Sequence, residues 1–280
     1  MKIIRTVRQM QRQSATLRRR GIRIALVPTM GALHAGHAAL IRAARRRADR
    51  VIVSIFVNPI QFNDPKDFET YPRDLKIDAD LAKRAGADML FVPDAGAIYP
   101  PGFRTFVEVE GVTARWEGVQ RPGHFRGVTT VVAKLFLIIS PDVAMFGQKD
   151  FQQSVVIRKM VRDLHLPVRI VVVPTIREPD GLAISSRNVR LSAEGRAIAP
   201  MIDRSLRFAQ DLFRKGEQNT DRLRKEVVKF LSETKAIEIE YVGFCDAESL
   251  EPIDRAASGT VVLIAVRIDG VRLIDNLRLS

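Results

Sequence analysis

Two histidines, His34 and His37, stand three residues apart in "PTMGALHAGH" (28–37), directly after the apolar run "IRIALV" (22–27). The chain has four histidines in all, and the same ten residues hold two glycines and a proline. A strand that enters a helix near Gly36 would present backbone N–H groups and partial positive charge, which favour phosphate. Imidazoles at i, i+3 can face one ligand and donate hydrogen bonds to its oxygens. The stretch predicts a phosphate site, with a tight strand-to-helix turn as the alternative.

A second group of polar residues, Gln148 to Asp150, follows the apolar run "VAMFG" (143–147) in the stretch "FGQKD" (146–150). Gly147 has no side chain to keep a ligand away from the backbone. Lys149 supplies a cation for phosphate, and the carboxylate of Asp150 suits a ribose hydroxyl or Mg²⁺. We expect this group at the same sheet edge as the histidine loop, because the carboxyl ends of parallel strands share one edge.

Hydroxyl groups and a guanidinium gather in "DGLAISSRN" (180–188). Ser185 and Ser186 can donate to phosphate oxygens, and Arg187 offers a planar fork of donors. A helix N-cap is the plain alternative for one of the serines. That alternative does not account for the arginine, so an anion-binding loop is the stronger interpretation.

A buried-strand pattern also precedes Gln61, in the stretch "NPIQF" (58–62). An amide donates to a carboxylate or hydroxyl and accepts from an amine. Asn58 belongs to the same stretch and is expected on the same wall of the site. Most glutamines are surface residues, so this stretch by itself is a weak signal.

Short apolar runs alternate with helix-like stretches over the first 175 residues. Runs that are apolar throughout are typical of strands covered on both faces, and strand alternating with helix predicts a parallel sheet of the Rossmann-like class. The predicted strands are 23–28, 51–57, 88–93, 143–147 and 168–174. The predicted helices are 37–48, 74–86, 127–140 and 151–164.

The pattern changes after about residue 175. Two helix-like stretches are followed by three strand-like runs, which suggests a smaller α+β domain with antiparallel strands. Asp269-Gly270 between the last two runs is a strong hairpin signal. We expect a Rossmann-like domain over residues 1–180 and the smaller domain over 181–280. The C-terminal helices are predicted at 192–215 and 220–234, and the strands at 237–246, 260–268 and 271–279.

Charge and composition restrict the partners. The formal net charge is +13, with basic residues scattered along the chain and no aromatic residues interleaved with the densest groups. RNA-stacking surfaces need such aromatic residues, so we expect anionic small substrates rather than nucleic acid. The longest apolar stretch, 128–139, is interrupted by Lys134 and too short to span a bilayer, so no membrane partner is expected. The one cysteine, Cys245, suits a cytoplasmic protein.

H-x-G-H in this context resembles the signature of the adenylyl-transferring nucleotidyltransferases, which include the class I aminoacyl-tRNA synthetases. A closer resemblance comes from motifs in order along the chain. They resemble the pantothenate synthetases, or pantoate–β-alanine ligases, and the match runs from the first strand to about residue 200, with "LIDNLRL" (273–279) similar to the family's ending. The ordered motifs are "PTMGALHAGH" (28–37), "VSIFVNPIQFN" (53–63), "RPGHFRGVTTVVAKLF" (121–136), "FGQKDFQQ" (146–153) and "DGLAISSRN" (180–188).

The resemblance implies the joining of pantoate to β-alanine with ATP and Mg²⁺. Pantoyl-adenylate and pyrophosphate form first, and the amine then displaces AMP. It implies catalytic roles for His34, His37 and Lys149, with Mg²⁺ held mainly through the ATP phosphates. A homodimer is also implied. The implied pantoate and β-alanine contacts are Gln61, Gln153 and Asn58. The implied ATP-binding residues are Met30, Gly31, Ala32, Leu33, His34, Ala35, Gly36, His37, Gly147, Gln148, Lys149, Asp150, Ile176, Ile184, Ser185, Ser186 and Arg187.

Two positions depart from the family's usual pattern. Gln148 stands where a glutamate is usual, and Ala35 where many members carry an acidic residue. Neither change removes a histidine or Lys149. Two rivals stay open: another nucleotidyltransferase of the same fold, which would not need Gln61 and Gln153 to face one hydroxy acid, and a basic RNA-binding relative of the tRNA synthetases.

Overall fold

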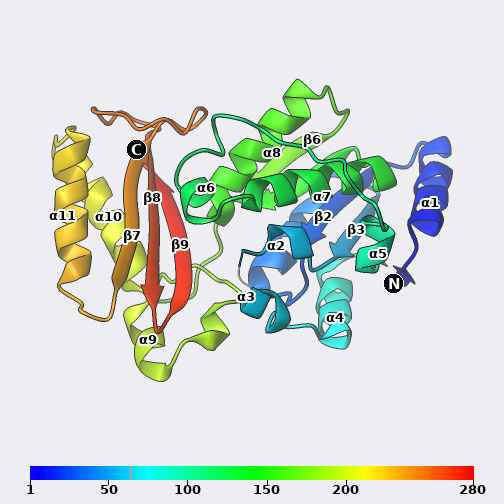
Figure 1. The fold of residues 1–280 in the computed structure, drawn as a ribbon, viewed down its shortest axis with the longest axis horizontal. Coiled ribbons are helices and arrows are strands. Elements are labelled where there is room, and N and C mark those ends of the chain that lie inside the picture. The colour runs from blue at the N-terminus through cyan, green and yellow to red at the C-terminus, as the bar shows by residue number, and fades with distance from the viewer. Residues whose placement is uncertain (64) are drawn as a thin grey trace. The chain divides into compact units, whose positions relative to one another are not determined.

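The computed structural model describes residues 1–63 and 65–280, and the chain folds as two compact units (Figure 1). Unit 1 comprises residues 1–147 and 156–174. Unit 2 comprises residues 148–155 and 175–280. The sequence-based division at residue 180 stays a prediction.

A six-stranded parallel sheet forms the centre of unit 1. The predicted α/β class with a parallel sheet is confirmed, and all five predicted strands are present. Strand β1 was not predicted, because its three residues are too few to show a pattern. The strands are β1 (Lys2–Ile4), β2 (Ile24–Thr29), β3 (Arg50–Ile55), β4 (Met89–Phe91), β5 (Val143–Gly147) and β6 (Arg169–Val173).

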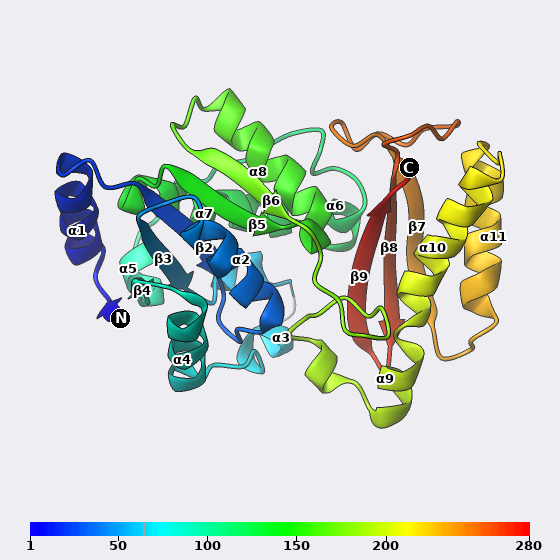
Figure 2. The ribbon, with the colours of Figure 1, turned by 180° about the vertical axis from the view of Figure 1, so that it is seen from behind.

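Helices cover both faces of this sheet. Helices α1 and α7 lie on one face, and α2 with α4 on the other, as comparison of Figures 1 and 2 shows. The helical segments before β6 are α1 (Val7–Arg19), α2 (Ala35–Arg45), η1 (Pro59–Gln61), α3 (Pro65–Glu69), α4 (Leu75–Ala85), α5 (Ala95–Ile98), α6 (Glu117–Gln120), α7 (His124–Ile139), η2 (Gln148–Asp150) and α8 (Phe151–Asp163). Within residues 1–63 and 65–280, no helix combines the length and apolar character needed to cross a membrane.

The start of α7 differs from the prediction. The predicted start is Gly127, but the helix begins at His124, after Gly123 in the left-handed region at φ 79°. Glycine adopts this conformation without a steric penalty, so it can turn the chain directly into the helix. Gly127 instead lies inside the helix, where its missing side chain allows a close approach described below.

In the strand order β1-β4-β3-β2-β5-β6, successive strands are added toward one edge of the sheet from β2 to β4 and toward the other edge from β5 to β6. The topological switch point therefore lies between β2 and β5. Open α/β sheets bind ligands outside the carboxyl ends of the strands at this point. In unit 1 the segment that follows β2 is the histidine loop. The fold therefore puts "MGALHAGH" where a Rossmann-like sheet binds its ligand.

Unit 2 is built on a three-stranded antiparallel sheet of β7 (Glu238–Cys245), β8 (Val261–Ile268) and β9 (Val271–Arg278). Asp269 and Gly270 both have positive φ, 53° and 71°, as the predicted hairpin requires. The predicted helix 192–215 is two helices, because Pro200 has no backbone N–H and so interrupts the hydrogen bonds of the helix, although Ala199 and Pro200 keep right-handed helical angles. The helical segments are η3 (Asn188–Arg190), α9 (Ala193–Ile198), α10 (Met201–Arg214) and α11 (Thr220–Ser232).

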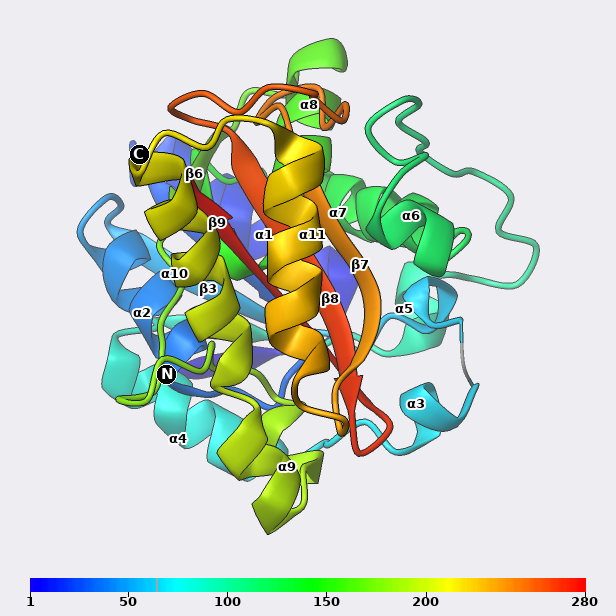
Figure 3. The same cartoon turned by 90° about the vertical axis from the view of Figure 1, so that its left-hand side faces the viewer.

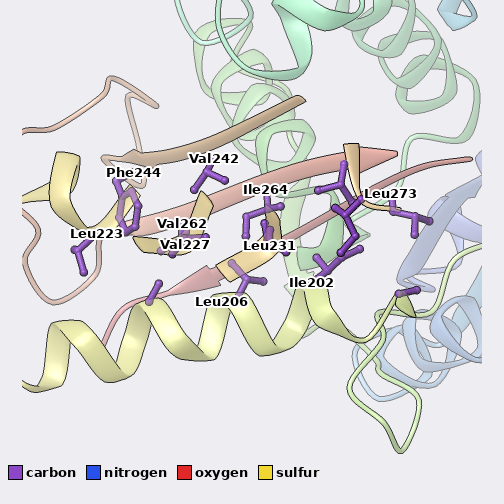
Figure 4. Close-up of a cluster of buried hydrophobic side chains, with 14 of the residues drawn as sticks. Ile202, Leu206, Leu223, Val227, Leu231, Val242, Phe244, Val262, Ile264 and Leu273 are labelled. Atoms are coloured by element: carbon purple, nitrogen blue, oxygen red, sulfur yellow. The ribbon is translucent and has the colours of Figure 1, made fainter. Parts of the chain in front are cut away.

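Helices α10 and α11 lie side by side over one face of this sheet (Figure 3). The apolar side chains between the helices and the sheet form the core of unit 2 (Figure 4). Its members come from both helices and all three strands, so the core fixes β9 in place. Residues of this core include Ile202, Leu206, Leu223, Val227, Leu231, Val242, Phe244, Val262, Ile264 and Leu273.

Candidate functional site

The loop after β2 is fixed by hydrogen bonds to its backbone N–H groups. Asp78 of α4 accepts from Leu33 N at 2.7 Å and from Ala32 N at 3.1 Å. Ala32 has φ 49°, a left-handed conformation that costs a non-glycine residue roughly 1–2 kcal/mol. Gly31 has φ 85°, and an added Cβ would lie 2.9 Å from an Asp78 oxygen. The carboxylate therefore holds the loop in a strained shape that only a glycine at position 31 permits.

Asp78 itself is 3% exposed. Burial raises the pKa of its carboxyl above the usual value, against the lowering effect of the Leu33 and Ala32 N–H groups. This residue was not among the predicted site residues. A signal was present, because Asp78 lies on the buried stripe of α4 with Ala82 and Ala85.

His34 and His37 cap the start of α2. Nδ1 of His34 accepts from Gly36 N, and Nδ1 of His37 accepts from His34 N, both at 3.2 Å. A neutral imidazole whose Nδ1 accepts carries its proton on Nε2, so each ring has an Nε2–H donor. The ring centroids lie 4.1 Å apart. The sequence predicts backbone N–H groups facing a ligand at this helix start; the N–H groups of His34 and Gly36 instead donate to the imidazole rings.

A buried pair of amides follows β3. Asn58 is 1% and Gln61 8% exposed, and Asn58 Nδ2 donates to Gln61 Oε1 at 2.9 Å. Gln61 Nε2 lies 3.0 Å from Met30 Sδ, a weak acceptor in the histidine loop. The structure therefore brings together three predicted site residues of unit 1: Met30, Asn58 and Gln61.

The start of α7 supports this pair from behind. An added Cβ at Gly127 would lie 2.7 Å from Ile60 O and 2.8 Å from Gln61 Cα, so only glycine fits. His124 is 7% exposed and bonds to Gln61 O through Nδ1 at 2.9 Å. Its Nε2 lies 3.1 Å from Arg121 Nη1. His124 therefore fixes the backbone of Gln61 from inside the protein.

In unit 2, the turn η2 carries Lys149 and Asp150. Lys149 Nζ and Asp150 Oδ1 lie 3.8 Å apart, and the side chain of Lys149 is 18% exposed. Asn276 of β9, which is 3% exposed, donates to Gln148 O and Lys149 O, both at 2.9 Å. The last strand of the chain therefore positions the turn that presents Lys149. Gln153 lies half-buried on the first turn of α8.

The loop 175–190 folds back on itself. Ile184 N donates to Ile176 O at 3.0 Å, which joins two residues of the expected ATP-binding set. Ser185 Oγ accepts from Arg187 N at 3.2 Å, so this serine closes a turn and is not a helix N-cap. Ser186 and Arg187 are half-buried.

Arg177 holds this loop to β9. Its Nη1 donates to Asp275 Oδ2 at 2.5 Å and its Nη2 donates to Asp275 Oδ1 at 3.0 Å. Nη1 also lies 3.2 Å from Asp203 Oδ1. It also donates to Gly181 O at 3.0 Å. Burial would lower the pKa of Arg177, but the hydrogen bonds and charge of Asp275 and the charge of Asp203 raise it. The guanidinium thus stays charged and ties the loop to the strand.

A pocket in unit 2 is formed where these parts meet. Lys149 and Ser185, both predicted site residues, line it together. Arg177, Asp275 and Asn276 were not among the predicted site residues, although the last two lie in the motif "LIDNLRL". The lining residues are Lys149, Leu182, Ala183, Ser185, Asn188, Ile202, Leu273, Ile274 and Asp275.

The family model for pantoate–β-alanine ligase matches residues 2–278. A pantothenate synthetase of Geobacter sulfurreducens is 54% identical over 276 residues, which cover 99% of this chain and 98% of that one. A pantothenate synthetase of Moorella thermoacetica is 48% identical over 280 residues, covering 100% and 99%.

Solved structures agree. The pantothenate synthetase of Thermus thermophilus superposes with a TM-score of 0.94 at 45% identity and covers 99% of both chains. The pantoate–β-alanine ligase of Francisella tularensis, solved with a β,γ form of ATP and β-alanine, has a TM-score of 0.82 at 35% identity and covers 99% and 97%. Since similarity in sequence and fold extends over nearly the whole chain, this chain belongs to the pantoate–β-alanine ligase family.

Proposed function

We propose that this chain joins pantoate to β-alanine at the cost of ATP, through pantoyl-adenylate. The single observation that carries the proposal is the full-length match to pantoate–β-alanine ligases. The geometry of the histidine loop supports it, because two Nε2–H donors stand together at the carboxyl end of β2.

In the first step the pantoate carboxylate attacks the α-phosphorus of ATP, and pyrophosphate leaves. A carboxylate is already a nucleophile, so the protein needs to hold it in line and to stabilise charge on the leaving group. We assign the stabilisation of that charge to His34, His37 and Lys149. Gln61 and Gln153 are assigned to the small substrates, with Asn58 on the same wall of the site. Residues 30–37 and 147–150 are assigned to ATP, together with Ile176, Ile184, Ser185, Ser186 and Arg187.

In the second step the β-alanine amine attacks the acyl carbon, and AMP leaves. The acyl–oxygen bond breaks as the amide bond forms, and the amine loses a proton. No pyrophosphate departs in this step, so it makes less demand on the cationic groups.

Mg²⁺ fits the donors available. Among the described residues, no three or more histidine, cysteine, aspartate or glutamate side chains form a metal cage. Mg²⁺ in such enzymes is usually held by substrate phosphates and one or two carboxylates. Asp150, whose side chain is 48% exposed, would be such a carboxylate, and bound Mg²⁺ would neutralise phosphate charge.

The test is exchange of labelled pyrophosphate into ATP. The proposed first step requires that exchange depends on pantoate and not on β-alanine. Exchange without pantoate would favour the rival nucleotidyltransferase. A salt-sensitive shift with RNA, in a protein inactive with pantoate, would favour the RNA-binding rival.

We also propose a cytoplasmic homodimer, on the family resemblance alone. The chain mass is 31.4 kDa, so light scattering at micromolar concentration should give about twice this mass. A monomer at that concentration would contradict the proposal.

A further inference from the structure

A chain of hydrogen bonds in unit 1 ends at Gln61. Tyr99, at the end of α5, donates its hydroxyl to Asn58 Oδ1 at 2.8 Å. Asn58 Nδ2 donates to Gly127 O at 3.1 Å and to Gln61 Oε1 at 2.9 Å. Both hydrogens of the Asn58 amide are therefore used, and its oxygen is used by the tyrosine.

The direction of this chain follows from chemistry. A backbone carbonyl only accepts, so Gly127 O requires the NH₂ end of Asn58. The oxygen end of Asn58 then faces Tyr99, and only a protonated hydroxyl can satisfy it. Because the second Asn58 hydrogen goes to Gln61, Gln61 must turn its oxygen toward Asn58. Its NH₂ group then points the other way.

Tyr99 is well held for this task. Its ring packs against Phe103 at 5.0 Å and Phe56 at 6.1 Å between centroids, so the hydroxyl has a fixed position. Burial raises the pKa of Tyr99, which keeps the hydroxyl protonated across the neutral range. The donor at the start of the chain is therefore always present.

The far end of the chain has a weak partner. Gln61 Nε2 donates to Met30 Sδ, and a thioether is a poor acceptor for an amide that is 8% exposed. An oxygen of a bound substrate would be a better one. We propose that Tyr99, acting through Asn58, positions Gln61 as a hydrogen-bond donor toward an acceptor oxygen of pantoate, so that Tyr99 is a positioning residue for substrate binding. This rests on the proposed function.

The first variant is Tyr99→Phe, which keeps the ring packing and removes the hydroxyl. Losing one hydrogen bond of the chain should raise the KM for pantoate about 3- to 10-fold. The KM for ATP and kcat should stay within about twofold of the wild-type values, because the proposed interaction affects pantoate binding and not the binding or reaction of the ATP phosphates. Tyr241→Phe in β7 is the control for the same chemical change outside unit 1, and its KM for pantoate should equal that of the wild type.

A double-mutant cycle separates positioning from general packing. In a Gln61→Ala background, Tyr99→Phe should add nothing to the KM for pantoate, because the tyrosine acts through the missing amide. If Tyr99→Phe raised the KM for pantoate by the same factor in the wild-type and Gln61→Ala backgrounds, the proposal would be overturned. An unchanged KM for pantoate in Tyr99→Phe alone would also overturn it.

Asn58→Asp covers the case in which Tyr99→Phe unfolds, as thermal melting would show. It keeps the acceptor for Tyr99 and removes both donors, so Gln61 turns its NH₂ inward and the KM for pantoate should rise by at least about tenfold. A KM equal to that of the wild type would overturn the proposal. Pantoate-dependent pyrophosphate exchange by the wild type is measured first. Its absence refutes the proposed function and this inference together, whereas normal exchange with an unchanged KM in the variants refutes only the positioning role.

Discussion

Replacing Asp78 with alanine should loosen the histidine loop. The wild-type carboxylate takes two backbone N–H groups, at 2.7 and 3.1 Å, and hydrogen bonds to a charged partner contribute about 1.5–3 kcal/mol each. Burying the charge opposes this gain, as the raised pKa indicates. The net loss for Asp78→Ala should be about 2 kcal/mol of unfolding free energy.

Asp78→Asn tests the charge separately. Its amide oxygen can keep one N–H, and the relief of buried charge offsets the lost bond, so stability should change by less than about 1 kcal/mol. In the wild type the folded pKa lies above the unfolded value of 3.8, so stability falls as pH rises through that window. Asp78→Asn should abolish that pH dependence.

In both variants the rate of adenylation should fall by a larger factor than the loss of unfolding free energy alone would suggest. Asp78→Asn loses one of the two hydrogen bonds to the loop and Asp78→Ala loses both. Ala32 should then leave its left-handed conformation and the imidazoles should shift, and a displacement of about 1 Å can cost about 10²-fold in rate. Asp74→Ala is the matched control, because Asp74 also accepts two backbone N–H groups, but from Lys76 and Ile77 of α4 and not from the histidine loop. Urea unfolding and single-turnover adenylation measure the two effects. Wild-type adenylation in Asp78→Ala, or an equal loss in Asp74→Ala, would refute the reasoning.

His37→Ala should slow adenylate formation by about 10²–10³-fold in rapid-quench experiments and spare the reaction of preformed pantoyl-adenylate with β-alanine; equal losses in both steps would contradict this. Asn276→Ala removes two hydrogen bonds to the Lys149 turn and should lower the unfolding free energy by about 2 kcal/mol in urea titrations, with a raised KM for ATP. An unchanged KM would show that β9 does not position the turn. Burial raises the pKa of Cys245 to about 12, so a disulfide reagent at pH about 8 should label the unfolded chain and leave the native protein unlabelled.

The strands of unit 1 could be predicted because their pattern is local. Each of β2, β3 and β5 is a mainly apolar run bounded by turn residues. Because both faces of these strands are buried, the apolar residues follow one another and do not alternate with polar residues. The Asp269-Gly270 hairpin is equally local, because the turn chemistry is carried by two adjacent residues. The three residues of β1 form a strand only because β4 lies beside them, so their own pattern could not predict it.

The candidate site divides in the same way. His34, His37 and Gln61 stand in short motifs that can be recognised along the chain. The residues that hold them come from elsewhere in the sequence: Asp78 lies 45 positions from Leu33, and Asn276 lies 127 from Lys149. Such pairs depend on the tertiary fold, which periodicity and spacing do not encode.

The products of the complete reaction give the most direct test of the proposed chemistry. Purified protein is incubated with pantoate, β-alanine, ATP and Mg²⁺, and the products are separated and identified by mass. Adenylation through His34, His37 and Lys149 predicts pantothenate, AMP and pyrophosphate in equal amounts, with no product when pantoate is omitted. ADP and phosphate in place of AMP and pyrophosphate would contradict adenylation and indicate an acyl phosphate.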